Sequence, residues 1–216
     1  SIAFIFFLSL FFVLPISATE ISLMTYNVEN LFDTKNDFLK DDKAFLPASK
    51  KRDVYHKSAC RRIENQKWRE ECLNLDWNEE AKNHKILNIV KVVTSYDLDG
   101  ADIVAFQEIE NENVLKDLFE ALEPFGYSDF ILLEGKDYRG IDSAIVSKFP
   151  IKESRLHFIK FSPGFPTKDT RPILEAQIDL SGNILRVYSV HFPAPFLDSV
   201  MRKDAFISLE SLLKSH

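Results

Sequence analysis

The sequence predicts a layered α/β sandwich, and three observations lead to this fold class. In the first half of the chain, segments with the apolar periodicity of helices alternate with short segments typical of strands. In the second half the pattern changes to a series of strands, the last two separated by the hairpin signal Ser181-Gly182-Asn183. Several strands are apolar on both faces, so both faces must be covered. Helices combined with hairpins favour a sandwich over a purely parallel, doubly wound sheet.

The size and charge of the chain limit its class. Its 216 residues carry 27 Lys and Arg against 33 Asp and Glu, a formal net charge of −6. This length suits one sizeable domain or two small ones and can bury roughly two-thirds of the surface of the unfolded chain. The negative net charge excludes a polycation that coats nucleic acid. Any recognition of phosphate must therefore come from a limited region of the protein.

Residues 1–18 predict a secretory signal peptide. Residues 2–14 are an uncharged apolar run, too short for a comfortable membrane anchor, and Pro15 and a small-residue cleavage site near Ala18 follow it. A membrane-anchoring or buried helix is the alternative, which Pro15 disfavours. The signal peptide implies a secreted or periplasmic protein. No Met or basic leader precedes Ser1, so we expect the first residues of the natural protein to lie before the start of this sequence.

The folded domain is expected over residues 19–216, with one insertion. Residues 21–28 have the β-branched and aromatic content of a first strand. The apolar pattern is then lost over a span too long for an ordinary connection inside a compact domain. We interpret residues from about 34 to 80 as the insertion.

A cysteine pair and a cluster of positive charge mark the insertion. Cys60 and Cys72 are the only cysteines and predict one disulfide in an exported chain. Only His56 lies close to them, so the pair makes a poor zinc site. Residues 50–69 contain eight Lys or Arg and two acids, hence a net charge of +6. This stretch either contacts phosphate or is a plain solvated loop.

The remaining elements follow the insertion in order. Apolar residues at helical spacing predict a helix over 81–96, followed by a buried strand over 102–107. A second helix is expected over 111–122, with Asn111 as its N-cap. Five further strands and a closing helix are predicted over 130–133, 142–147, 155–161, 173–180, 184–192 and 199–213.

Three of the predicted strands end on polar side chains, namely Asn27, Glu108 and His191. Ligands of α/β proteins gather beyond strand ends. A carboxylate and an amide oxygen suit a hard cation such as Mg²⁺, and imidazole transfers protons near neutral pH. Each residue alone has a plainer explanation as a turn or solvated residue, and Arg171 alone is a loop cation paired with Asp169. Together they predict a cleft that holds a cation.

Five segments occur in a characteristic order: TYNVENLF (25–32), DIVAFQEIEN (102–111), YRGIDSAIVSKFPI (138–151), DTRPILEAQI (169–178) and LRVYSVHFPAP (185–195). Together they resemble the endonuclease/exonuclease/phosphatase superfamily, which contains deoxyribonuclease I, exonuclease III and the inositol polyphosphate 5-phosphatases. The resemblance extends from residue 21 to about 213, apart from the insertion. It implies a four-layer α/β sandwich of two mixed sheets flanked by helices, and metal-dependent hydrolysis of a phosphate ester.

The resemblance also implies a role for individual residues. Asn27 and Glu108 match residues that hold the metal, with Glu108 as its principal carboxylate and as a catalytic residue. Arg171 resembles an arginine that approaches the substrate phosphate in the deoxyribonuclease I branch. His191 resembles the strand-end histidine that serves there as acid and phosphate contact, and Tyr138 would line the substrate groove. The implied cofactor is Mg²⁺, with Mn²⁺ or Ca²⁺ as alternatives.

The family pattern continues with a G-D-F-N-like strand, a further Asp and an S-D-H-like segment, which this sequence lacks. We therefore expect an internal fragment, truncated at the C-terminus, of an exported Mg²⁺-dependent endonuclease acting on DNA or RNA. A phospholipid or inositol-phosphate phosphodiesterase or phosphatase of the same superfamily is the alternative. A non-catalytic secreted binding module is the third hypothesis. No stable protein partner is implied.

Overall fold

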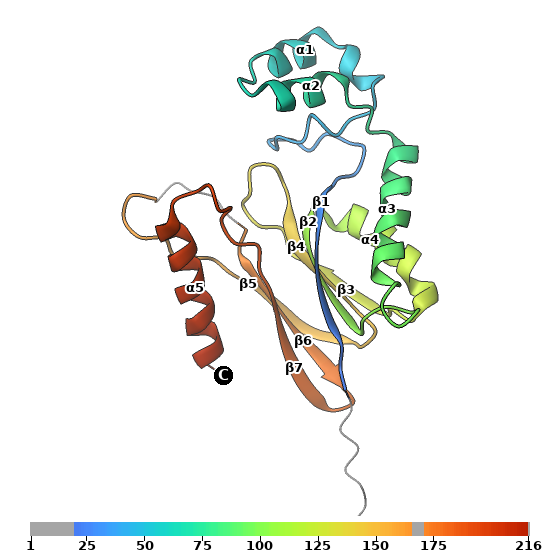
Figure 1. Ribbon diagram of the computed structural model, residues 1–216, viewed down its shortest axis with the longest axis vertical. Helices are drawn as coiled ribbons and strands as arrows, with labels where there is room; N and C mark the ends of the chain where they lie inside the picture. Colours follow the sequence, from blue (N-terminus) through green and yellow to red (C-terminus); the bar gives the residue numbers. More distant parts are fainter. Residues whose placement is uncertain (1–19, 166–170, 216) are drawn as a thin grey trace, which may run out of the picture.

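The computed structural model describes residues 20–165 and 171–215, in which two sheets form (Figure 1). The strands of the first sheet are β1 (Leu23–Leu31), β2 (Ile103–Ile109), β3 (Asp129–Leu132) and β4 (Asp142–Ser147). They lie in the order β1-β2-β4-β3, with β1 parallel to β2 and the other pairs antiparallel. The predicted signal peptide, residues 1–18, lies outside the described residues.

The second sheet consists of β5 (Ile151–His157), β6 (Ile173–Leu180) and β7 (Asn183–Ser189), in that order. The predicted pair of sheets is confirmed, but only the first is mixed, because the second is antiparallel throughout its described strands. The predicted turn joins β6 to β7. Its residues Ser181 and Gly182 have φ angles of 57° and 98°, both in the left-handed region that a two-residue hairpin favours. So short a link forces an antiparallel pair.

Helices cover the outer face of the first sheet and flank the second. Helices α3 (Glu79–Val93) and α4 (Glu112–Leu122), the latter continued by the short 3₁₀ helix η2 (Glu123–Phe125), pack on the first sheet. Helix α5 (Ser199–Lys214) flanks the second (Figure 1). A separate apolar core lies between the sheets and contains Ile103, Ala105, Ile145, Leu174, Ala176 and Ile178. The order helix, sheet, sheet, helix is the predicted four-layer sandwich.

None of the helices within residues 20–165 and 171–215 combines the length and the apolar character that crossing a membrane requires.

The insertion contains helices that the apolar pattern did not predict. They are the 3₁₀ helix η1 (Lys50–Arg52), α1 (Val54–Arg61) and α2 (Gln66–Asn74). Each α-helix begins with a polar N-cap, since the side chain of Asp53 accepts the N–H of His56 and that of Asn65 accepts the N–H of Trp68. Figure 1 places the pair above the end of the first sheet where β1 and β2 finish.

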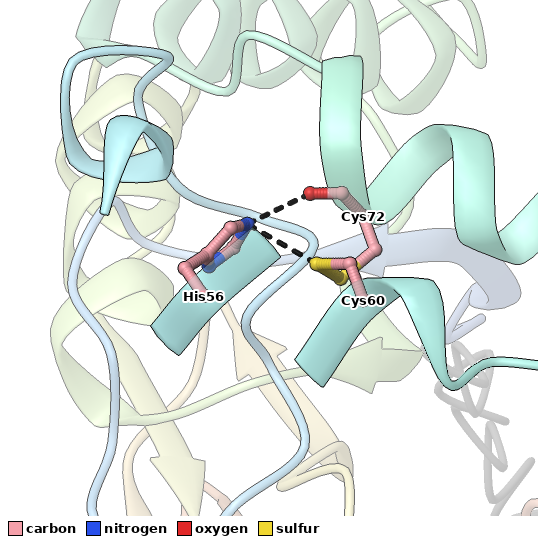
Figure 2. Close-up of side chains that lie close together, drawn as sticks. All are labelled: His56, Cys60 and Cys72. Atoms are coloured by element: carbon pink, nitrogen blue, oxygen red, sulfur yellow. Dashed lines mark hydrogen bonds between the residues drawn. A yellow bond between two sulfur atoms is a disulfide. The ribbon is translucent and has the colours of Figure 1, made fainter. Parts of the chain in front are cut away.

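The predicted disulfide between Cys60 and Cys72 is confirmed, and it joins α1 to α2 with a Cα–Cα distance of 5.5 Å. Both cysteines are completely buried. The Nε2–H of His56 donates to the carbonyl of Cys72 at 3.0 Å and lies 3.2 Å from Cys60 Sγ (Figure 2). The disulfide and this ring therefore hold the two helices together where few apolar side chains are available.

We expect replacement of both cysteines by alanine to destabilise the helix pair by about 3 kcal/mol, because the unfolded insertion then regains the freedom of an open loop. Limited proteolysis of the wild type and the variant measures the effect, with cleavage between residues 50 and 75 expected to accelerate in the variant. Reducing agent should produce the same change in the wild type and none in the variant. Equal protease resistance of both proteins would contradict this account.

Candidate functional site

The ends of β1 and β2 bring Asn27 and Glu108 together. The two strands are parallel neighbours, with Asn27 opposite Gln107, so their C-terminal ends meet at one edge of the sheet. The side-chain amide of Asn27 donates to Glu108 Oε1 at 3.2 Å, and Asn27 Oδ1 accepts the N–H of Glu29 at 2.9 Å. The amide and the acid thus lie side by side, as the strand-end pattern predicts. Their function as metal-binding residues stays a prediction.

The backbone at this edge departs from regular strand geometry. Glu108 has φ 67°, in the left-handed region, and the pairing of β2 with β4 shifts register between Gln107 and Ile109. Glu29 and Asn30 are also left-handed, where β1 loses its register with β2. Such a conformation costs a non-glycine residue on the order of 1–3 kcal/mol. Bulges of this kind redirect side chains and are frequent beside active sites.

His191 and Arg171 extend the site from the second sheet. His191 Nε2 lies 3.4 Å from Glu108 Oε1, and the Nε–H of Arg171 donates to His191 Nδ1 at 3.1 Å. A second nitrogen of the guanidinium, Nη2, lies 3.3 Å from His191 Nε2, so Arg171 faces both ring nitrogens. Burial lowers the pKa of His191 to about 4, with the positive charge of Arg171 acting in the same direction and Glu108 opposing it. The imidazole is therefore neutral at pH 7.

Asp137 completes this chain of contacts, and it was not among the predicted residues. Arg171 NH1 donates to Asp137 Oδ2 at 2.9 Å, and the side chain of Asp137 is only 1% exposed. Its other oxygen accepts the N–H of Arg139 at 2.9 Å. The alternative partner of Arg171, Asp169, lies outside the described residues. The one sequence signal for Asp137 is that it directly precedes Tyr138, a predicted site residue.

Tyr138 is not part of the contact chain. Its side chain is 61% exposed, and within the described residues it donates no hydrogen bond to the other predicted site residues. Its carbonyl accepts the N–H of Asp41 at 2.8 Å, which ties this loop to the start of the insertion. Its place in a substrate groove stays a prediction.

Lys85 is a further basic group near the site that the sequence pattern did not single out. Its Nζ donates to the carbonyls of the left-handed residues Glu29 and Asn30. Burial lowers the pKa of Lys85, and the charges of Glu29 and Glu108 oppose this shift. Lys85 thus supports the irregular end of β1 from helix α3.

Asp142, beside the site at the start of β4, makes stability depend on pH. Burial raises its pKa from 3.8 to about 6, although its carboxylate accepts the N–H of Gly135. Since the folded pKa exceeds the unfolded value, the folded state retains a proton that the unfolded state has already lost. The contribution of Asp142 is therefore most favourable below about pH 4 and is lost as the pH rises toward 6.

We expect Asp142→Asn to remove this part of the pH dependence and to raise the free energy of unfolding at pH 7 by at most about 3 kcal/mol. Asn keeps the acceptor for Gly135 and removes the buried charge. Urea unfolding between pH 4 and pH 7 measures the change, with Asp97→Asn as the exposed control. A pH dependence that is the same in Asp142→Asn and in the wild type would refute the interpretation.

Comparison with known proteins identifies one family model that matches residues 65–196, that of the Endonuclease/Exonuclease/phosphatase family. The matched range includes Glu108, Asp137, Arg171 and His191, while Asn27 precedes it. No curated protein sequence matches the chain.

Several solved structures are similar. A β-hairpin deletion mutant of beta toxin from Staphylococcus aureus is 16% identical, with 92% of this chain and 62% of that chain covered and a TM-score of 0.49. For sphingomyelinase C from Streptomyces griseocarneus the identity is 13%, the coverage 92% and 60%, and the TM-score 0.47. For D. rerio TDP2 complexed with a single strand DNA product the values are 20%, 61%, 48% and 0.44. The chain spans between 48% and 62% of the length of these structures.

Proposed function

The chain belongs to the endonuclease/exonuclease/phosphatase family, and we propose that it is a Mg²⁺-dependent phosphodiester hydrolase that acts on nucleic acid. Members of this family are generally hydrolases of phosphate esters. The observation that carries the proposal is the unbroken chain of contacts from Asn27 through Glu108, His191 and Arg171 to Asp137. It brings a carboxylate, an imidazole and a guanidinium within contact distance of one another.

The residues at this site suit a hard divalent cation. The carboxylate of Glu108, whose side chain is 16% exposed, would hold the ion. Asn27 directs its NH₂ group, not its oxygen, toward that carboxylate, so it orients Glu108 in this geometry. When bound there, Mg²⁺ would polarise a phosphoryl oxygen and stabilise the charge that builds up during hydrolysis.

Two side chains of the protein, Arg171 and His191, are positioned to bind the substrate phosphate. The guanidinium of Arg171 is fixed by Asp137 and His191, so it is ready to bind a non-bridging phosphate oxygen. The neutral imidazole of His191 carries one N–H, which can donate a hydrogen bond to a phosphate or leaving oxygen. Hydrogen-bond donors that are held in place before the reaction stabilise the transition state more than donors that must reorient.

Nucleic acid is supported as the substrate by the basic stretch of the insertion, residues 50–69, which lies above the site (Figure 1). Most of its cations are exposed, and among them are Lys50, Arg52, Lys57, Arg61 and Arg62. Lys51, by contrast, is buried, and its Nζ donates to two backbone carbonyls. Exposed cations that neutralise phosphates give sequence-independent affinity for a phosphate backbone.

A phospholipid substrate is the second candidate, because exposed apolar side chains lie on the same insertion. Phe38, Leu39, Tyr55 and Trp68 are all at least 60% exposed. Aromatic residues beside basic ones suit a membrane interface as well as stacked bases. An exported location is proposed in either case, and it is supported by the disulfide. A secreted binding module is the third candidate.

Parallel assays on the full-length protein test the proposal: Mg²⁺-dependent cleavage of plasmid DNA, and release from sphingomyelin or phosphoinositide vesicles. We expect DNA cleavage that EDTA abolishes. Cleavage of lipid without cleavage of DNA would establish the second candidate, and no EDTA-sensitive turnover of either would leave the binding module. Neutral replacements of Lys50, Arg52 and Lys57 should flatten the salt dependence of DNA binding, whereas replacement of Lys116 on α4 should not.

A further inference from the structure

A second group of carboxylates lies beside the first site, at the junction of the insertion with β2. One oxygen from each of Asp37, Asp42 and Glu110 lies within 4.8 Å of the others. Asp42 is fully buried and Glu110 is 2% exposed. Asp33, which is also buried, accepts a hydrogen bond from Asn111 next to this group. So many buried acids must either retain protons or be balanced by a positive charge.

Each of the two buried carboxylates has one oxygen without a partner. Asp42 Oδ2 accepts the N–H of Asp37 at 2.6 Å, and Glu110 Oε2 accepts the N–H of Asp33 at 2.7 Å. Asp42 Oδ1 and Glu110 Oε1 are buried and accept no hydrogen bond from any described residue. Within residues 20–165 and 171–215, no Lys, Arg or His nitrogen forms an ion pair with Asp37, Asp42 or Glu110. The protein itself therefore leaves these two oxygens and their charge unsatisfied.

We propose that Asp37, Asp42 and Glu110 form a second cation site, distinct from Glu108, that binds Ca²⁺. Carboxylate oxygens alone make a hard donor set, and Ca²⁺ accepts six to eight oxygen ligands in an adaptable geometry. Mg²⁺ demands a near-ideal octahedron, which a loop and a strand end meet less easily. The backbone N–H groups that hold Asp42 Oδ2 and Glu110 Oε2 orient the ligands before the ion binds.

The position of this site indicates a structural role for the ion. It joins the loop that carries Asp37 and Asp42 to the end of β2, two residues beyond Glu108. The same loop contacts the segment that holds Arg171, because Lys40 Nζ donates to the carbonyl of Asp137 at 3.2 Å. Binding of Ca²⁺ thus stabilises the first loop of the insertion and the backbone on which the first site is built.

Calcium binding and thermal unfolding of the full-length protein test the proposal. For the wild type we expect Ca²⁺ to raise the thermal midpoint above its value in EDTA by about 5 °C or more. Glu108→Gln should keep this shift and Asp42→Asn should lose it. In EDTA, Asp42→Asn should melt at or above the wild-type temperature, because one buried charge is gone. Equilibrium dialysis should show one Ca²⁺ fewer per molecule in Asp42→Asn.

Three results would overturn the proposal. The first is an equal Ca²⁺ shift in Asp42→Asn and the wild type. The second is a shift that Glu108→Gln abolishes, which would place the ion at the first site only. The third is a midpoint that rises with acid but not with Ca²⁺, which would indicate carboxyl groups that share a proton. If the Asp42→Asn variant does not fold, the same measurements are made on Glu110→Gln instead. None of these measurements requires activity, so they are independent of the proposed function.

Discussion

Replacement of Glu108 by glutamine is expected to lower the rate of phosphodiester hydrolysis by at least about 100-fold. Glutamine has nearly the same shape and can still accept from Asn27, whose amide contacts Glu108 Oε1 at 3.2 Å. It lacks the negative charge that would hold the cation. The loss should therefore appear in kcat at saturating Mg²⁺, and the thermal midpoint in metal-free buffer should change by no more than about 2 °C.

A matched control is Glu120→Gln, which removes an exposed carboxylate of α4 paired with Lys116 at 3.8 Å. This variant should retain wild-type turnover and stability, because exposed pairs of this kind contribute little. Undiminished hydrolysis by Glu108→Gln would contradict the assignment of Glu108. A loss of activity that only parallels unfolding would show a structural role instead.

Replacement of Arg171 by glutamine is the second large effect, and we expect kcat to fall on the order of 100-fold. Arg171→Lys should restore only part of the rate, because lysine cannot contact His191 and Asp137 through one rigid fork. Arg155→Gln, at an arginine that is 52% exposed on β5, is the control and should leave kcat unchanged.

Asp137 acts through Arg171 and is a positioning residue. We expect Asp137→Asn to reduce kcat less than Arg171→Gln does, and the double variant to be no slower than Arg171→Gln alone. Asp137→Asn should also destabilise the fold by about 3 kcal/mol, because it leaves Arg171 without its buried partner. Rate losses that simply multiply in the double variant would show that Asp137 acts independently.

The regular part of the fold could be predicted because burial imposes clear periodicity. The strand expected over 142–147 is β4, and the helix expected over 111–122 begins one residue after its N-cap, Asn111, which accepts the N–H of Val114. The strand expected over 155–161 begins four residues earlier, at Ile151. In the described sheet β5 is an edge strand with charged, exposed side chains, so its apolar pattern is incomplete.

The helices of the insertion could not be predicted from apolar periodicity, because their stability has another source. Helices α1 and α2 bury chiefly Cys60 and Cys72. A disulfide and side-chain caps stabilise them in place of an apolar face. The presence of only two cysteines did predict the covalent link, but it carries no information on the conformation between them.

The proximity of Asn27 and Glu108 could be predicted because the ends of parallel strands meet at one edge of a sheet. The proximity of Arg171 and His191 to them could be predicted only from the family resemblance, because these two residues come from the second sheet. Asp137 could not, because an acid in a polar loop looks solvated until a partner from a distant segment buries it. The left-handed conformation of Glu108 also lacks a sequence signal, since a glutamate has no preference for positive φ.

The central claim is that Glu108 holds a catalytic cation beside Asn27, and Mn²⁺ binding followed by electron paramagnetic resonance tests it most directly. The titration compares Asp42→Asn with the double variant Asp42→Asn/Glu108→Gln, so that the second carboxylate group does not contribute. We predict that one Mn²⁺ ion binds to the first protein and that Mg²⁺ displaces it, whereas the double variant binds none in the same range. Equal Mn²⁺ binding by the two proteins would contradict the account.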